Sequence, residues 1–340
     1  MKKILVTGGA GYIGSHTVVE LVAAGFTPVI IDNFCNSERY IVDRVEELTG
    51  TNIALYEGDC NDLAFLKSVF EKEKDIKGAI HFAAYKAVGE SVGQPLKYYS
   101  NNVGSTVTLI EALIAYNAPL LVFSSSCTVY GQPDVLPVTE ETPRKEAESP
   151  YGNTKKICED IISDSVAAKN PLKAISLRYF NPVGAHPSSK IGELPLGIPN
   201  NLVPYITQTA AGLRNQLTVF GDDYNTTDGT CIRDYIHVVD LAKAHVKALE
   251  FLAKKEETSL YDVFNVGVGK GFTVMEVINA FQKTNDKALN YTIGPRRSGD
   301  IEKIFASVDK ATKELGWTAE ISLEESMRDS WNWQKTLRNE

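Results

Sequence analysis

The chain has 340 residues, long enough for a large core, and its net charge of −8 argues against a general nucleic-acid or anionic-membrane surface. Its five cysteines are widely spread without a CxxC pair, which argues against a disulfide framework and a zinc site and favours a reducing cytoplasm. No apolar run approaches the about 20 residues that a membrane span needs. A dinucleotide domain with a smaller partner domain is the expected organisation.

The N-terminus predicts a strand, a glycine loop and a helix. A strand-forming run at residues 2–7 leads into Gly8, Gly11 and Gly14, and a helix is predicted over residues 15–24. In such a loop Gly8 permits a tight turn, Gly11 lets the backbone approach a pyrophosphate, and Gly14 lets helix and strand pack closely. The N-terminus of the helix offers free N–H groups to phosphates. The pattern indicates a dinucleotide site, with a ligand-free glycine turn as the alternative.

Asp32 follows the next predicted strand, residues 27–31, and lies 18 positions after Gly14. A carboxylate at this place accepts hydrogen bonds from the adenosine ribose hydroxyls and repels a 2′-phosphate. No arginine lies at positions 33–36 to hold such a phosphate. The sequence therefore favours NAD over NADP, with a solvated loop aspartate as the alternative.

Four further strand-like runs alternate with helical patterns, at residues 53–56, 79–82, 120–123 and 173–179. This alternation predicts a doubly wound parallel α/β sheet, which binds ligands at the carboxyl ends of its strands. Segments 58–59 and 81–84 follow two of these strands and are candidates for adenine and nicotinamide contacts. His81 lies within an apolar run, so we expect a packed, hydrogen-bonded histidine rather than a catalytic one.

A serine-rich turn is predicted at residues 124–131, after the strand 120–123. Because it follows a carboxyl end, its hydroxyls could hydrogen-bond a substrate. Ser126 is the candidate in this turn.

Tyr151 and Lys155 share one face of a predicted helix because they are four residues apart. Ser149 is a plausible N-cap and Pro150 suits the first turn. An ammonium beside a phenol favours the phenolate and lowers the pKa of the tyrosine, so the pair can supply a base. With Ser126 the pair predicts a constellation for positioning, proton transfer and electrostatic tuning. An unrelated surface Tyr and Lys is the alternative.

Over nearly its whole length the chain resembles the extended short-chain dehydrogenase/reductase superfamily, and within it the UDP-hexose 4-epimerases. The resemblance is carried by the serine turn and by segments 8–16, 86–91, 178–187, 197–202 and 229–240. It implies a Rossmann-type doubly wound parallel sheet (residues 1–180, with 236–260 as a candidate return segment) and a smaller mixed α/β UDP-sugar domain (181–340). It also implies a cytoplasmic homodimer of galactose metabolism.

The activity implied by the resemblance is interconversion of UDP-glucose and UDP-galactose by transient oxidation at C4, rotation of the 4-keto sugar and return of hydride. NAD would stay tightly bound, no metal is implied, and Tyr151, Lys155 and Ser126 would be catalytic. The implied cofactor contacts are Gly8, Gly11, Tyr12, Ile13, Gly14, Asp32, Asn33, Asn36, Ser37, Asp59, Cys60, Phe82, Ala83, Ala84, Lys86, Asn101, Ser124, Tyr151, Lys155 and Phe180. The implied substrate contacts are Lys86, Ser126, Tyr151, Asn181, Asn200, Asn201, Leu202, Thr218, Val219, Phe220, Arg233, Arg297 and Asp300.

Ile304 matches the family's gate position, where a bulky aromatic tends to exclude N-acetylated sugars and a small residue admits them. Isoleucine is intermediate, so activity on UDP-GlcNAc and UDP-GalNAc stays open. Arginine makes forked hydrogen bonds to phosphate oxygens, which suits Arg233 to a diphosphate, although a salt bridge with Asp234 or another acid is the alternative.

Two other functions compete with the epimerase reading. A nucleotide-sugar 4,6-dehydratase usually carries Asp-Glu after its active-site Thr, whereas Ser126 is followed here by Cys127 and Thr128. A catalytically silent NAD-binding module would be expected to have a damaged Ser-Tyr-Lys set, and all three residues are present.

Overall fold

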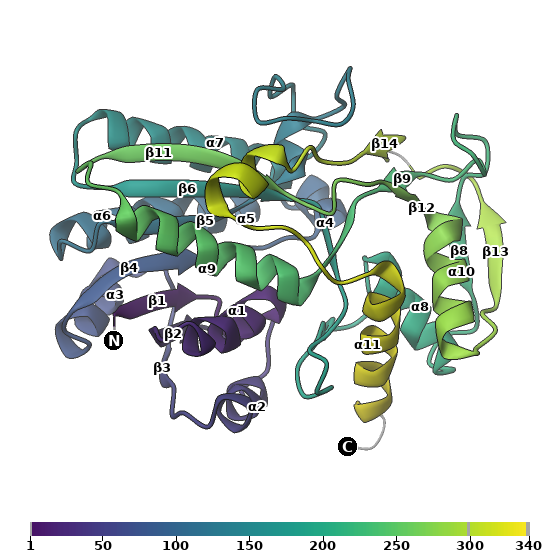
Figure 1. Ribbon diagram of the computed structural model, residues 1–340, viewed down its shortest axis with the longest axis horizontal. Coiled ribbons are helices and arrows are strands. Elements are labelled where there is room, and N and C mark those ends of the chain that lie inside the picture. The colour runs from purple at the N-terminus through teal and green to yellow at the C-terminus, as the bar shows by residue number, and fades with distance from the viewer. Residues whose placement is uncertain (1, 298–299, 338–340) are drawn as a thin grey trace.

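A seven-stranded parallel sheet forms the centre of the molecule, for which a computed structural model describes residues 2–297 and 300–337 (Figure 1). The strand order is β11-β6-β5-β4-β1-β2-β3. This arrangement confirms the predicted doubly wound fold. The strands are β1 (Lys3–Thr7), β2 (Thr27–Asp32), β3 (Ala54–Glu57), β4 (Ile76–His81), β5 (Leu120–Ser126), β6 (Lys173–Tyr179) and β11 (Leu260–Val266).

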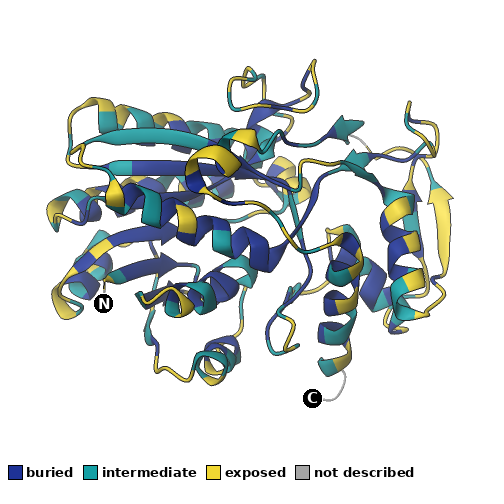
Figure 2. Ribbon diagram, in the orientation of Figure 1, coloured by how far each residue is buried: buried dark blue, intermediate teal, exposed yellow. Residues whose placement is uncertain are grey.

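Helices cover both faces of the sheet because its strands are apolar on both sides. Side chains alternate along a strand, so Ile4 and Val6 face one core while Leu5 faces the other. Figure 2 shows these central strands as buried. The first core is closed by α1 (Tyr12–Ala23), α2 (Tyr40–Thr49) and α9 (Val238–Lys254), and the second by α3 (Leu63–Lys72), α6 (Gly104–Ala115) and α7 (Pro150–Ala167).

The remaining strands and helices lie beside the carboxyl edge of the sheet and have a core of their own (Figure 1). Three small sheets pair β7 (Asn181–Val183) with β10 (Tyr235–His237), β8 (Leu217–Phe220) with β13 (Tyr291–Gly294), and β9 (Ile232–Arg233) with β12 (Phe272–Thr273) and β14 (Lys303–Ile304). The helices are α8 (Leu202–Ala210), α10 (Val274–Asn285) and α11 (Leu323–Thr336). Two short helices, α4 (Val88–Gly93) and α5 (Pro95–Tyr98), precede α6.

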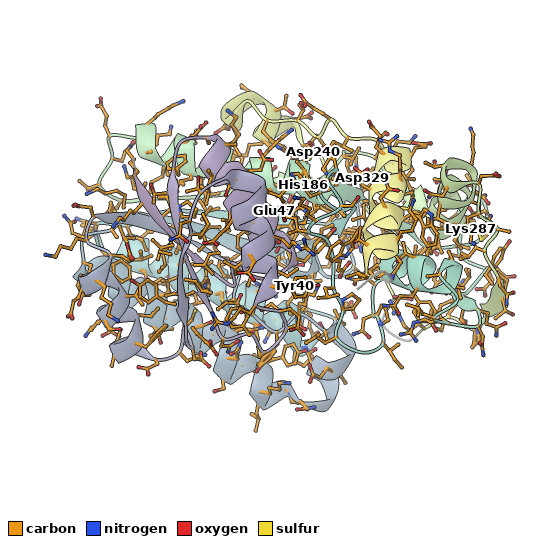
Figure 3. All side chains as sticks on the ribbon, turned by 90° about the horizontal axis from the view of Figure 1, so that it is seen from below. Tyr40, Glu47, His186, Asp240, Lys287 and Asp329 are labelled. Carbon is orange, nitrogen blue, oxygen red and sulfur yellow. The ribbon has the colours of Figure 1, made fainter. Side chains whose placement is uncertain are left out.

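Contacts between distant segments join these parts of the chain. His237 Nε2 lies 3.5 Å from Asp329 Oδ2 on α11, and an ion pair links Glu47 of α2 with Lys190. Figure 3, which views the molecule from below the orientation of Figure 1, labels Glu47, His186 and Asp329. Strand β11 pairs with β6, so residues well beyond position 180 complete the large sheet. The division into domains at residue 180 stays a prediction.

Two element boundaries differ from those expected. Helix α1 begins at Tyr12 rather than Ser15, because Gly11 is its extended N-cap and its carbonyl accepts from Ser15 N at 2.9 Å. The predicted serine turn is wrong for residues 124–126, which are the last three residues of β5. They pair with Leu177–Tyr179 of β6, and this pairing keeps the backbone extended.

Gly14→Ala should destabilise the fold by about 1–3 kcal/mol or more, because a Cβ at Gly14 would lie 2.2 Å from the Gly8 carbonyl oxygen. Gly89→Ala is the matched control, since Gly89 is also helical but a Cβ there meets nothing within 4 Å. Thermal unfolding of both variants checks this. Equal melting temperatures for the two variants would contradict the packing role of Gly14.

Candidate active site

The implied cofactor residues gather at the carboxyl edge of the central sheet. They lie in the loops after β1, β2, β3 and β4, at the end of β5, directly after β6, on helices α1 and α7, and in the helical segment Tyr99–Val103. All of these strands are parallel, so their carboxyl ends meet at one edge. The structure therefore brings together residues spread from Gly8 to Phe180, as the fold prediction requires.

The glycine loop between β1 and α1 is tightly packed against the sheet. Gly8 has φ +69°, and a Cβ there would lie 2.9 Å from Ala83 N. A Cβ at Gly11 would meet only the Gly8 carbonyl oxygen, at 3.2 Å. The backbone of this loop fits the predicted tight turn, because only glycine adopts it without a clash. Contact of Gly11 with a pyrophosphate stays a prediction.

Asp32 is buried and shapes the loops around it. Its Oδ2 accepts from Ala10 N at 3.0 Å, and its Oδ1 accepts from Phe34 N at 2.9 Å and from Ser37 Oγ at 2.8 Å. The carboxylate therefore ties the glycine loop to the segment after β2, which also holds Asn33 and Asn36. The sequence does not predict this structural role of Asp32. Its hydrogen bonds hold the carboxylate at the end of β2, where a contact with the ribose is predicted.

The loops after β3 and β4 are joined through asparagines. Asp59 Oδ1 accepts from Asn61 N at 2.8 Å, and Asn61 Nδ2 donates to Asn101 Oδ1 at 3.3 Å. Buried Asn102 in turn bonds both backbone groups of Tyr85 and donates to Thr154 Oγ1 at 3.2 Å. This network links the implied cofactor segments to α7.

Four of the implied cofactor contacts after β3, β4 and β6 are largely apolar. Cys60 and Phe180 are 5% exposed, and the Phe82 ring contacts the His245 ring at a tilt of 52°, with ring centroids 4.7 Å apart. Ala83 packs closely on Gly8 through its backbone nitrogen. The side chains of Cys60 and Phe82 belong to the cores on the two faces of the sheet, so their backbone is better placed than their side chains to meet a ligand.

His81 is a packed histidine, as its apolar surroundings predict. Its Nδ1 lies 2.7 Å from Thr7 Oγ1 and its Nε2 lies 3.5 Å from Ser105 Oγ. Burial lowers the pKa of His81 to about 3, so the ring is neutral at physiological pH.

The structure brings Ser126, Tyr151 and Lys155 together at the end of β5. Helix α7 begins as predicted, with Pro150 in its first turn and Ser149 Oγ accepting from Gly152 N at 3.2 Å. The Ser126 hydroxyl is a hydrogen-bond partner of the Tyr151 phenol. Lys155 Nζ donates to the Ser124 carbonyl oxygen at 2.6 Å, and the hydroxyl of Ser124 bonds the hydroxyl of Tyr179.

The electrostatics of this trio differ from the expectation. Burial raises the pKa of Tyr151 well above its ordinary value, with Tyr179 adding to the increase. Lys155 does not offset this, because its ammonium bonds Ser124 and lies 5.9 Å from the centroid of the Tyr151 ring. Burial also lowers the pKa of Lys155 to about 8. The buried site favours the neutral form of both groups.

On the substrate side, Asp300 lies between two arginines. Arg297 Nη2 is 2.7 Å from Asp300 Oδ1, and Arg233 Nη2 is 3.9 Å from the same oxygen. The Arg297 guanidinium also lies over the Phe220 ring, 5.6 Å from its centroid. Arg233 does not pair with Asp234, whose carboxylate accepts from Val268, Gly269 and Ala306 backbone N–H groups. The two arginines, Phe220 and Asp300 thus form one cluster.

Other implied substrate residues are placed differently. Val219 is 1% exposed and packs in the core, so its side chain faces away from a ligand. Thr218 lies beside it on β8, and Leu202 packs partly against the same core. Asn181 N donates to the Asp234 carbonyl at 3.0 Å, whereas Asn200 is exposed.

Glu193 joins two implied site residues and was not found from the sequence. Its Oε1 accepts from Lys86 Nζ at 3.2 Å and from Asn201 Nδ2 at 2.8 Å. Lys86 follows β4 while Asn201 precedes α8, so Glu193 connects the implied cofactor and substrate residues. The segment 197–202 was recognised as a motif, but the carboxylate just before it carries no local signal.

Ile304 lies close to the catalytic turn, Cys127–Tyr130, which directly follows Ser126. It is 2% exposed and packs in a cluster with Val129, Tyr130 and Phe180, and Cys127 lies against this cluster. The backbone of Ile304 pairs with Arg233 through β14 and β9. The predicted gate side chain is therefore adjacent to both the catalytic turn and the arginine cluster.

Comparison with known proteins gives a consistent result. A family model described as GDP-mannose 4,6 dehydratase matches residues 5–330. The chain is 52% identical over 336 residues to the UDP-glucose 4-epimerase of Bacillus subtilis, covering 99% of this chain and 98% of that protein. The mouse (Mus musculus) UDP-glucose 4-epimerase is 49% identical over 98% of this chain and 97% of its own.

Solved structures agree with the sequence relatives. The UDP-glucose-4-epimerase from Stenotrophomonas maltophila, with bound NAD and formylated UDP-arabinopyranose, is 45% identical with a TM-score of 0.96 and covers 100% of this chain and 99% of that one. The enzyme from Bifidobacterium longum, in complex with NAD+ and UDP, is 46% identical with a TM-score of 0.94, and 99% of each chain is covered.

A chain with this sheet and this trio at its carboxyl edge falls in the class of extended short-chain dehydrogenases/reductases. Because it matches its relatives at about half of all positions along nearly their whole length, it belongs to the UDP-glucose 4-epimerase family.

Lys155→Met should raise stability more at pH 7 than at pH 9.5. The folded-state pKa of Lys155, about 8, lies below the ordinary value near 10.5, so the buried ammonium destabilises the wild type below pH 8. As pH rises above 8 the folded protein releases this proton first and the penalty shrinks, by about 2 kcal/mol at pH 9.5. Urea unfolding of both proteins at the two pH values measures this. A stability difference that is independent of pH would contradict the shifted pKa.

Proposed function

We propose that this protein interconverts UDP-glucose and UDP-galactose, an isomerase reaction at sugar C4 that uses NAD. The observation that carries the proposal is the meeting of Ser126, Tyr151 and Lys155 beside the glycine loop, in a chain 52% identical to a UDP-glucose 4-epimerase over 99% of its length. The residues present fit NAD, because the loop at Gly8 and Gly14 has no room for side chains and Asp32 closes the next strand. When bound, NAD accepts hydride from C4 and returns it, and its oxidised ring brings a positive charge.

Tyr151 is the base of the proposed reaction. Its phenolate takes the proton of the sugar 4-hydroxyl, either directly or through Ser126, which is its hydrogen-bond partner. Because burial raises the pKa of Tyr151 and Lys155 alone does not offset this, the phenolate would need further positive charge, which the oxidised ring of NAD would add to the Lys155 ammonium present below pH 8. In the return half of the reaction the same phenol gives the proton back to the sugar oxygen.

The nucleotide end of the substrate is the anchor. We assign Arg233 and Arg297 to the diphosphate, because arginine forks match phosphate oxygens and these two lie in one cluster with Asp300. Asn181, Asn200, Asn201, Leu202 and the strand edge Thr218–Phe220 complete the UDP contacts. Because the UDP part of the substrate would supply most of the binding energy, the hexose would stay free to rotate. Rotation would present the other face of C4 for the return of hydride.

We further propose a cytoplasmic homodimer that acts in galactose metabolism. Support for a dimer comes from apolar side chains exposed on neighbouring helices, with Val92 64%, Leu96 82% and Val107 45% exposed on α4, α5 and α6. The five free cysteines suit a reducing compartment. No helix in the described ranges is long and apolar enough to cross a membrane.

Activity on N-acetylated UDP-hexoses is the second candidate, and the observation that favours it is Ile304. This side chain lies beside the catalytic turn and is smaller than the aromatic residue that excludes such sugars in the family. A 4,6-dehydratase is less well supported although the matching family model carries that description, because Cys127 and Thr128 provide no carboxylate after Ser126. A silent module would not keep the complete trio.

Tyr151→Phe should lower the turnover of UDP-galactose by about 10²–10⁴-fold, because it removes the proton acceptor. UDP affinity should stay at the wild-type value, since the arginine cluster is untouched. Tyr116→Phe is the control, because Tyr116 bonds Glu71 on the surface at 3.0 Å. Turnover assays test the loss of activity, and calorimetric titration with UDP tests the unchanged affinity. Full activity of Tyr151→Phe would show that Tyr151 is not the base.

A further inference from the structure

Glu159 lies on α7 one turn beyond Lys155, with its side chain 1% exposed. Its carboxylate accepts four hydrogen bonds. Oε1 accepts from Ser125 Oγ at 2.6 Å and from Arg178 Nε at 2.9 Å, and Oε2 accepts from Arg178 Nη2 at 2.6 Å and Arg144 Nη1 at 3.2 Å. Two carboxylate oxygens offer about four acceptor positions, so the group is fully used. The contact with Arg178 is the forked, bidentate kind.

The partners of Glu159 flank the catalytic trio. Ser125 lies between Ser124, whose carbonyl accepts from Lys155, and Ser126, which bonds Tyr151. Because side chains alternate along a strand, the Ser125 hydroxyl points to the opposite face of β5 from that of Ser124. The Glu159 carboxylate therefore joins α7 to the end of β5 through Ser125, a residue that lies between the two serines contacted by Lys155 and Tyr151.

The network continues from Arg178 into the catalytic turn. Arg178 Nη1 donates to Tyr130 OH at 3.0 Å, and Tyr130 OH donates to Asn265 Oδ1 at 2.7 Å. Tyr130 is fully buried and ends the turn that begins directly after Ser126. Arg178 on β6 and Asn265 on β11 are neighbours in the sheet. The Glu159 cluster thus fixes α7, three strands and the turn relative to one another.

The stability of the fold alone does not explain why the buried charges of Glu159 and Arg178 lie between α7 and β6. Desolvation of a buried ion pair opposes its attraction, and apolar side chains of similar volume often serve a fold equally well. What the forked pair adds is direction, because its hydrogen bonds hold only in one orientation of helix and strand. The catalytic contacts of Tyr151 and Lys155 depend on that same orientation.

We propose that Glu159 is a positioning residue for the chemical step: through Ser125 and Arg178 it sets where α7 presents Tyr151 and Lys155 to the end of β5. The inference rests on the proposed function, since the step it serves is the proton transfer at C4. Glu159 does not touch the substrate, so its loss acts on catalysis through geometry and charge and leaves the UDP anchor unchanged.

Glu159→Gln should lower kcat for UDP-galactose by about tenfold or more, with KM, UDP affinity and NAD content unchanged. Asp164→Asn is the matched control, because it removes an exposed carboxylate from the same helix, one turn beyond Asp160 and outside the Glu159 cluster. That control should keep wild-type kcat. Wild-type kcat in Glu159→Gln would overturn the inference.

The pH profile supplies a readout that a merely structural role would not move. Cys158 and Glu159 on α7, Tyr151, and neutral His81 from β4 surround Lys155, and the charge of Glu159 supports the ammonium. Glu159→Gln should therefore shift the alkaline limb of kcat to lower pH than in the wild type. If the alkaline limb of kcat lies at the same pH in Glu159→Gln and the wild type, the charge of Glu159 does not act on Lys155, and that part of the proposal is wrong.

The double variant Glu159→Leu/Arg178→Met covers the case in which Glu159→Gln fails to fold, because it leaves no unpaired buried charge. A folded double variant with reduced kcat and normal UDP binding supports the inference, and one with wild-type kcat overturns it. Wild-type protein that does not convert UDP-galactose would overturn the proposed function itself, so the two failures are distinguishable.

Discussion

The parallel pairing of β5 with β6 through Ser124, Ser125 and Ser126 is the constraint on which the site depends. The strand continues to Ser126, opposite Tyr179, so three successive hydroxyls point in alternate directions. Ser124 meets Tyr179, Ser125 meets Glu159, and Ser126 meets Tyr151. A turn at Ser124 would break this alternation of side-chain directions. The end of β5 thereby pairs with β6, bonds helix α7 through Ser125, and presents Ser126 to Tyr151.

Burial sets the electrostatic state of the site. It raises the pKa of Tyr151 and lowers the pKa values of Lys155 and His81, because a low-dielectric interior disfavours every charged form. The Tyr–Lys spacing provides the geometry for a base, while the charge that makes the phenol a base depends on what binds beside it. This explains why a nearby lysine need not produce a phenolate in the protein alone.

Local patterns were sufficient to predict the parts of the fold and the site that depend on neighbouring residues. The glycine loop, Asp32 at a strand end, and Ser149 with Pro150 at the start of α7 each follow from a few residues and simple stereochemistry. The doubly wound parallel sheet followed from the alternation of strands with helices, whereas the order of its strands comes from the structure.

Features that depend on distant residues could not be predicted in this way. The extension of β5 requires β6 as a partner, and Glu193 meets Lys86 across 107 positions of sequence. The partner of Arg233 is Asp300 rather than its neighbour Asp234, because backbone N–H groups already occupy the carboxylate of Asp234. Glu159 stands four residues after Lys155, a spacing that sequence alone could have singled out but whose partners only the fold reveals.

The most direct test of the central claim is to incubate the purified protein with UDP-galactose, without added nucleotide, and to quantify the products by chromatography. The account predicts UDP-glucose with no net change in the redox state of NAD. No product even after NAD is added, or a 4-keto-6-deoxy sugar in its place, would contradict it.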